Sequence, residues 1–172
     1  MAQKRRRCVL LLELCVPGVS VDARRIIVGL DDIILRIDFH SAGSDVIKVA
    51  LAQINATVGD LAGNARRIVD AALRAHAAGA QLLVAPELAL CGYPPEDLLL
   101  RPAFMRGCAD ALAAMAAELA ACDGLHVVVG HPHQFGELAD VRSKSWVIPK
   151  RFNAATVMNA GRIVGTYCKR EL

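Results

Sequence analysis

The chain has 172 residues, of which 55% are hydrophobic, so it is long enough to form one globular domain with an aliphatic core. Lys and Arg number 20 against 17 Asp and Glu, which gives a net charge of +3, and aromatic residues make up 4% of the chain. These values exclude a strongly basic surface with interleaved aromatic rings, and we therefore expect no nucleic-acid partner.

Residues 1–45 contain short apolar pieces without a sustained period. A basic stretch at 4–7 and an apolar stretch at 8–12 resemble a secretory signal, but Glu13 and Pro17 interrupt the pattern. No run approaches the roughly 20 apolar residues of a membrane span, so we expect no membrane partner. We interpret 1–45 as an N-terminal extension of doubtful status, with the natural translation start near Val46.

From residue 47 onward the hydrophobic pattern is regular and alternates between strands and helices. It predicts buried strands at 47–54, 81–85 and 125–130, helices at 61–78 and from 102 to near 124, and a closing hairpin of 151–158 and 162–169. Strands that alternate with helices favour an α/β fold with a largely parallel sheet, to which the hairpin adds an antiparallel pair.

Both predicted helices have one apolar stripe. In the first, Ile68 and Ala72 recur at helical spacing, and we assign Asn64 to the polar faces. In the second, Cys108 and Met115 belong to the stripe and are expected to serve packing.

The segment VAPELALCGYPPEDL places a single carboxylate, Glu87, directly after a buried strand and before a turn rich in Gly and Pro. Strand ends in open α/β sheets are where ligands bind. A solvated Glu87, or one bonded to nearby backbone amides, is the alternative on spacing alone.

The six cysteines are scattered, without a CxxC pair or a Cys/His cluster at zinc spacing. We expect reduced thiols in a cytoplasmic protein and no metal site. His131 and His133 flank Pro132 and could face one way on an extended segment, but without a third ligand nearby we interpret them as loop residues.

Four ordered blocks follow one another along residues 47 to 172: IKVALAQINATVGDLAGN, LLVAPELALCGYPPEDLLLRPAF, HVVVGHP and RFNAATVMNAGRIVGTYCKREL. Together they resemble the nitrilase (carbon–nitrogen hydrolase) superfamily. Within it, the GYPPEDLL and YCKREL segments are most similar to the glutaminase domain of glutamine-dependent NAD synthetases.

The resemblance implies that residues 46–172 are the N-terminal portion of a carbon–nitrogen hydrolase (glutaminase) domain. It implies part of a four-layer α-β-β-α sandwich with a Glu–Lys–Cys catalytic set. Glu87 takes the place of the general base, Lys169 that of the residue supporting the transition state, and Tyr93 that of a residue lining the glutamine pocket. Because a thiol must lose its proton to attack an amide, a partly desolvated Glu87 with a raised pKa would suit the task. Lys169 would offset negative charge on the substrate oxygen. Tyr93 could instead pack the turn against the core.

The nucleophilic Cys of the family comes well after the Lys block, and the chain ends three residues past Lys169. Cys168 should face away from Lys169, because successive strand residues point to opposite faces. We therefore expect no nucleophile in this chain and little activity from it alone.

The resemblance implies hydrolysis of the glutamine amide to supply ammonia for NAD synthesis. It also implies a C-terminal synthetase domain as partner and a homo-oligomer of the complete protein. We find no P-loop or GxGxxG, so no cofactor is expected here and ATP belongs to the synthetase domain. The alternatives are a stand-alone amidase acting on another small amide, and a non-catalytic remnant or interaction module.

Overall fold

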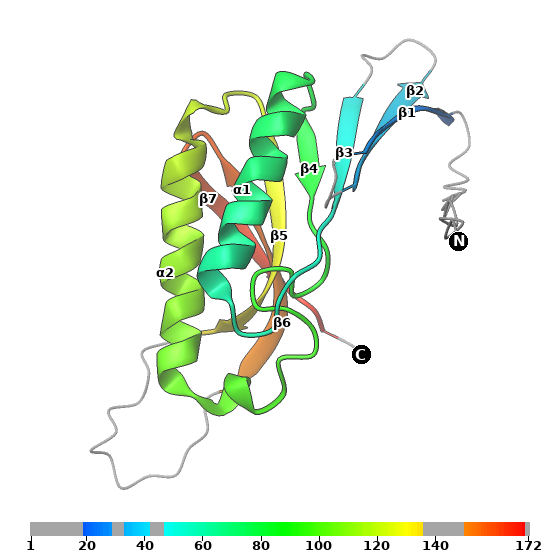
Figure 1. Ribbon diagram of the computed structural model, residues 1–172. Coiled ribbons are helices and arrows are strands. Elements are labelled where there is room, and N and C mark those ends of the chain that lie inside the picture. The colour runs from blue at the N-terminus through cyan, green and yellow to red at the C-terminus, as the bar shows by residue number, and fades with distance from the viewer. Residues whose placement is uncertain (1–18, 29–32, 42–46, 136–149, 171–172) are drawn as a thin grey trace, which may run out of the picture.

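The computed structural model describes residues 19–28, 33–41, 47–135 and 150–170. These residues form one mixed sheet and two α-helices, with the strands in spatial order β1 to β7 (Figure 1). The strands are β1 (Val19–Val28), β2 (Ile33–Ser41), β3 (Ile47–Gln53), β4 (Leu82–Val84), β5 (His126–Gln134), β6 (Arg151–Asn159) and β7 (Arg162–Cys168). The helices are α1 (Leu61–Ala77) and α2 (Pro102–Glu118), with short 3₁₀ helices η1 (Glu96–Leu100) and η2 (Leu119–Ala121).

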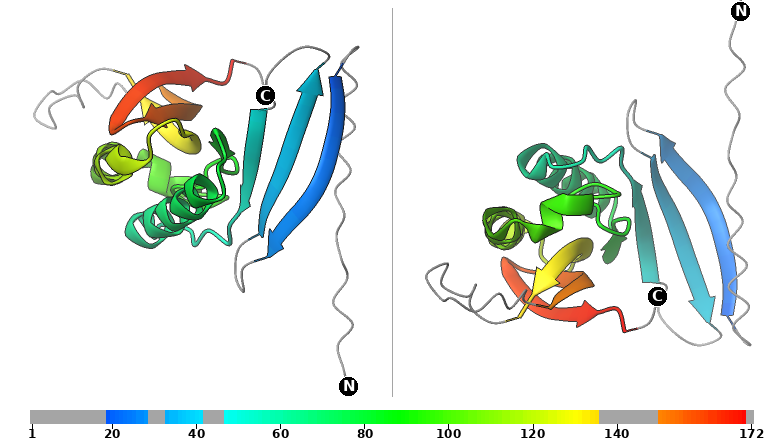
Figure 2. Two further views of the ribbon diagram at one scale, coloured as in Figure 1. Left: turned by 90° about the horizontal axis from the view of Figure 1, so that it is seen from above. Right: turned by 90° about the horizontal axis from the view of Figure 1, so that it is seen from below.

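The centre of the sheet is parallel and its two sides are antiparallel. β3, β4 and β5 run parallel, with α1 and α2 in the two crossovers, whereas β5, β6 and β7 pair antiparallel. Figures 1 and 2 show the two helices side by side on one face of the sheet. The predicted α/β class, with a parallel centre and a closing antiparallel hairpin, is confirmed.

Local sequence signals define the helix ends. The Asp60 side chain accepts a hydrogen bond from the Gly63 backbone amide at 2.9 Å and caps the start of α1. Gly79, at a φ of +75°, ends that helix in the left-handed conformation that glycine adopts readily. Pro102 occupies the first turn of α2, where its missing N–H costs nothing.

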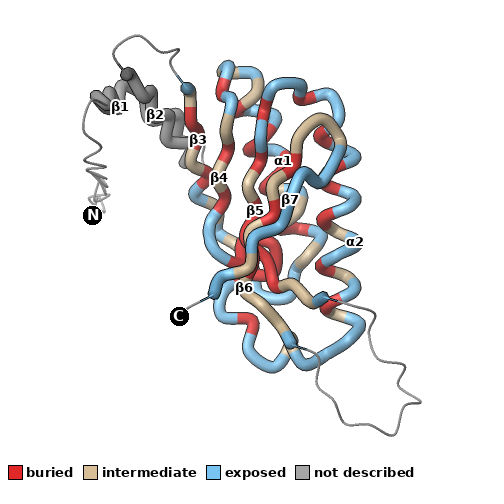
Figure 3. Tube along the Cα trace, turned by 180° about the vertical axis from the view of Figure 1, so that it is seen from behind, coloured by how far each residue is buried: buried red, intermediate tan, exposed pale blue. Residues whose placement is uncertain are grey.

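The core lies between the helix layer and the sheet, and Figure 3 shows buried residues along the helices and the central strands. The apolar stripes predicted for α1 and α2 face this core. Fully or almost fully buried residues of the core, from the helices and from the strands, include Ile68, Ala72, Leu83, Cys108, Met115, Leu125, Val127 and Val129. Removal of such side chains from water supplies the main force that holds the helices on the sheet.

Two strands precede the one that we expected to be first. β1 pairs with β2, and β2 pairs with β3 over residues 33–39, both antiparallel. Residues 1–18, 29–32 and 42–45 lie outside the described part of the chain. The interpretation of 1–45 as an extension stays a prediction.

β7 is the last strand of the sheet, and its residues are exposed along almost all of its length (Figure 3). Two large side chains of this strand, Val164 and Tyr167, are 63% and 66% exposed. Neither α1 nor α2, nor any other helix among the described residues, has the length and hydropathy to cross a membrane.

Candidate functional site

Glu87 stands in a tight turn that begins two residues after β4 and packs directly on β5. The Ala85 amide donates to the Val128 carbonyl at 2.9 Å, and the Leu90 amide donates to the Gly130 carbonyl at 3.2 Å. A β-carbon on Gly130 would lie 2.5 Å from the Pro86 carbonyl oxygen and 2.9 Å from the Glu87 Cα. Glycine at 130 therefore allows the turn to approach the strand closely.

Asn64 holds the other side of this turn. Its side chain is fully buried, and its Nδ2 donates to the Leu90 carbonyl at 3.1 Å and to the Thr57 carbonyl at 2.8 Å. Its Oδ1 accepts from the Thr57 amide at 2.8 Å. The assignment of Asn64 to an outer polar face is therefore wrong, because its polar atoms satisfy backbone groups inside the fold.

Lys169 and Asn153 are cross-strand neighbours at the end of the β6–β7 hairpin. The Lys169 amide donates to the Asn153 carbonyl at 2.8 Å, one step beyond the Ala154–Cys168 pair. Directly opposite residues on antiparallel strands project to the same face. This register brings both side chains toward the turn that holds Glu87.

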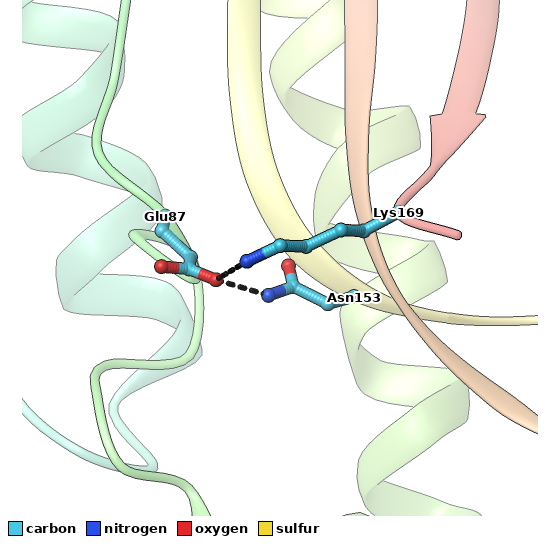
Figure 4. A network of polar contacts seen from close by, with 3 residues as sticks. All are labelled: Glu87, Asn153 and Lys169. Atoms are coloured by element: carbon cyan, nitrogen blue, oxygen red, sulfur yellow. Dashed lines mark hydrogen bonds and ion pairs between the residues drawn. The ribbon is translucent and has the colours of Figure 1, made fainter. Parts of the chain in front are cut away.

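The three side chains meet at one carboxylate oxygen, as Figure 4 shows. Lys169 Nζ lies 3.3 Å from Glu87 Oε1, which forms an ion pair across 82 positions of sequence. The Asn153 amide nitrogen donates to the same Oε1. The structure thus brings Glu87 and Lys169, from two separate sequence blocks, into direct contact and adds Asn153, which the sequence did not single out.

The pKa of Glu87 is lowered, whereas we expected it to be raised. The Asn153 hydrogen bond is the largest cause, followed by the hydrogen bond and charge of Lys169, and burial opposes them only weakly. The Glu87 side chain is 52% exposed, so desolvation is slight and the donors favour its charged form. Glu87 is therefore an ionised carboxylate that forms an ion pair with the Lys169 ammonium.

Tyr93 lies outside the network of Figure 4 and is 70% exposed. It does not pack the turn against the core, which was the alternative interpretation. Its part in binding a substrate stays a prediction.

No cysteine in the described part of the chain takes part in the Glu87 network. Cys91 is buried, and its thiol donates to the carbonyls of Gly92 at 3.3 Å and Leu88 at 3.6 Å. Burial raises the pKa of this thiol to about 11. Cys91 is therefore a packing residue held as a thiol, which is unsuited to nucleophilic attack.

His131 and His133 belong to β5, so their interpretation as loop residues is wrong. His131 is buried, with Nδ1 3.0 Å from the Pro132 carbonyl and Nε2 2.6 Å from the Thr156 hydroxyl. Desolvation lowers the pKa of His131, which favours the neutral ring. Among the described residues, no group of three or more His, Cys, Asp or Glu side chains is placed to hold a metal ion.

A cavity of about 350 Å³ lies between α2 and the strands β5 to β7. Met105, Leu112, His131 and Thr166 are among its lining residues, and neither Glu87 nor Lys169 is. The cavity and the Glu87 network are therefore separate features.

The family model for carbon-nitrogen hydrolases matches residues 48–172, and the chain belongs to that family. It is 43% identical over 115 residues to a glutamine-dependent NAD(+) synthetase of Synechocystis, covering 67% of this chain and 19% of the relative. With the corresponding protein of Xanthomonas campestris it shares 42% identity over 128 residues, covering 73% and 20%. The chain thus spans about one fifth of the length of these curated relatives.

Solved structures give the same relationship. A glutamine-dependent NAD(+) synthetase from Cytophaga hutchinsonii superposes with a TM-score of 0.60 at 26% identity, covering 73% of this chain and 19% of that one. The NitN amidase superposes with a TM-score of 0.56 at 27% identity, covering 73% and 45%. The prediction of a nitrilase-type fold from the four sequence blocks is confirmed.

Proposed function

We propose that this chain forms part of a glutamine-hydrolysing domain that supplies ammonia for NAD synthesis, with Glu87 as general base and Lys169 as the cation for the transition state. The observation that carries the proposal is the contact of 3.3 Å between Lys169 Nζ and Glu87 Oε1, made by side chains from two separate family blocks. The names of the relatives supply the substrate class.

In the proposed reaction, the nucleophile is a cysteine contributed by residues beyond Leu172. Glu87 accepts the thiol proton as sulfur bonds to the amide carbon of glutamine, and the Lys169 ammonium faces the oxygen that becomes negative. The C–N bond then breaks, ammonia leaves with the transferred proton, and a thioester remains. Attack by water releases glutamate and restores the thiol.

The solvent exposure of Glu87 and Lys169 agrees with a site that another part of the protein completes. Glu87 and Lys169 are 52% and 46% exposed, so the remaining wall of the cleft would come from the part that carries the cysteine. Enclosure there would also strengthen the attraction between Lys169 and the developing oxyanion. Tyr93 is proposed to line the glutamine pocket in that complete site.

The proposed partners are a C-terminal synthetase domain, which would use the ammonia and bind ATP, and further copies of the complete protein. The chain itself is proposed to need no cofactor. Alone, it is proposed to be inactive, because the nucleophilic cysteine of the proposed reaction is taken to come from another part of the protein.

The test uses the protein in which this chain is continued by its cysteine and synthetase regions. Lys169→Ala should abolish NAD synthesis supported by glutamine and leave synthesis supported by free ammonia nearly unchanged. Lys150→Ala is the matched control, since Lys150 is an exposed lysine just before β6. Equal loss of both activities in Lys169→Ala would refute the assigned role.

The likeness to the NitN amidase supports a second candidate, the hydrolysis of another small amide by a stand-alone enzyme. Ammonia release from a panel of aliphatic amides and glutamine separates the two candidates. A preference for the aliphatic amides would favour the amidase. A reading frame that stops at Leu172 would favour a non-catalytic remnant.

A further inference from the structure

We propose that Asn153 is a positioning residue that fixes the Glu87 carboxylate through Oε1 and so makes Oε2 the oxygen that accepts the proton. This inference rests on the proposed function for its chemical meaning. Its evidence is the geometry of the three side chains in Figure 4.

Asn153 is held more firmly than Lys169. It lies in β6, which pairs with β5 on one side and β7 on the other, and Pro132 is its partner in β5. Its carbonyl also accepts the Lys169 amide at 2.8 Å. The asparagine side chain has two rotatable bonds, whereas the lysine ammonium stands on a flexible four-carbon stem. The amide of Asn153 is therefore the better device for setting the direction of the carboxylate.

Both donors use the same oxygen of Glu87. Oε1 accepts from Asn153 Nδ2 and from Lys169 Nζ, and Oε2 accepts no hydrogen bond from any residue that the structure describes. An oxygen with two donors, one of them charged, is the less basic of the pair, so a thiol proton goes to Oε2. Lys169 spends one of its three N–H donors on Oε1 and keeps two for the oxygen of a substrate.

The experiment is a pH titration of the Glu87 carboxyl carbon by ¹³C NMR in the 172-residue chain. In the unsubstituted chain the pKa should lie below the ordinary glutamate value of about 4.3. Asn153→Ala should move it up toward that value. Asn153→Asp keeps the side-chain shape but replaces the donor by a carboxylate, and it should move the pKa above that value through like-charge repulsion.

Asn159→Ala is the matched control. Asn159 stands on the same face of the same strand, about 20 Å further along, and its amide donates to the Leu125 carbonyl at 3.0 Å. A loss of packing alone would lower the stability of both alanine variants, but only Asn153→Ala should move the Glu87 titration. If Asn153→Ala does not fold, Asn153→Asp decides the outcome. An unchanged Glu87 pKa in whichever of these variants folds would overturn the proposal.

The titration does not depend on catalysis, so its outcome can be distinguished from the outcome for the proposed function. A shifted titration with no glutamine hydrolysis in the complete protein would support the geometry and refute the reaction. In a complete protein that hydrolyses glutamine, Asn153→Ala should move the acid limb of the kcat/KM profile to higher pH, and Asn159→Ala should leave it in place. An acid limb that stays in place in Asn153→Ala would refute the positioning role while leaving the reaction intact.

Discussion

Gly130→Ala tests how the turn that carries Glu87 is held against β5. The added methyl carbon would meet three backbone atoms of the turn: Pro86 O at 2.5 Å, Leu88 N at 2.6 Å and Glu87 Cα at 2.9 Å. A carbon normally approaches a carbonyl oxygen to about 3.3 Å, so the turn must move by about 0.8 Å. Backbone shifts forced by an extra methyl group in a packed site typically cost about 1–3 kcal/mol.

The assay is urea denaturation, followed by circular dichroism, of the chain and of two alanine variants. Gly165→Ala is the control, because a β-carbon at Gly165 in β7 meets no atom within 4 Å. Gly165→Ala should leave the free energy of unfolding unchanged or raise it by up to about 1 kcal/mol, because alanine lowers the conformational entropy of the unfolded chain. Gly130→Ala should lower it by about 1–3 kcal/mol and weaken the Glu87–Lys169 contact. Equal stability of the two variants would show that the turn does not depend on this close approach.

Three further outcomes are expected. Asn64→Ala should lower the free energy of unfolding by about 1–3 kcal/mol in urea denaturation, because it leaves the buried Leu90 carbonyl without its Asn64 donor and removes both Asn64 bonds to the Thr57 backbone. A change within about 0.5 kcal/mol, typical of surface sites, would contradict the buried network. The Cys91 thiol, with a pKa of about 11, should resist alkylation by iodoacetamide at pH 8 in the folded chain and react in denaturant, as peptide mapping can show. Rapid alkylation of Cys91 in the folded chain would contradict its burial. The pKa of Glu87 in the folded chain lies below the unfolded value of about 4.3, so the ionised carboxylate stabilises the fold above that pH, and this stabilisation is lost as the pH falls through the folded pKa. Lys169→Met should make the loss of stability in acid smaller, as acid denaturation can measure. An identical acid profile of the variant would contradict the pairing of Glu87 with Lys169.

The helices and the hairpin could be predicted because their signals are local. The 3.6-residue spacing of apolar positions in α1, the Pro at the start of α2 and the Asn-Ala-Gly turn of the hairpin each act within a few residues. Strand β2 also had a local signal that we did not weigh. In the sequence, Leu35, Ile37 and Phe39 alternate with Arg36 and Asp38, which is the two-residue period of a strand.

The polar residues that complete the site could not be predicted in the same way. Asn64 bonds a carbonyl 26 positions away, and Asn153 bonds a carboxylate 66 positions away. Asparagine is common in turns and on surfaces, so composition gives no sign of such partners. The predicted direction of the Glu87 pKa shift was wrong for the same reason, because the shift depends on the hydrogen bond from Asn153 and on how little solvent the carboxylate loses.

Glu87 is proposed to act as the general base of an amide hydrolase whose nucleophilic cysteine comes from another part of the protein. The most direct test is to compare the rate of ammonia release from glutamine between the complete unsubstituted protein and its Glu87→Gln variant. Glutamine at position 87 keeps the size of the side chain but cannot take the thiol proton, and the rate should fall by about 10²–10⁴-fold. A Glu87→Gln protein that releases ammonia at the unsubstituted rate would contradict the account.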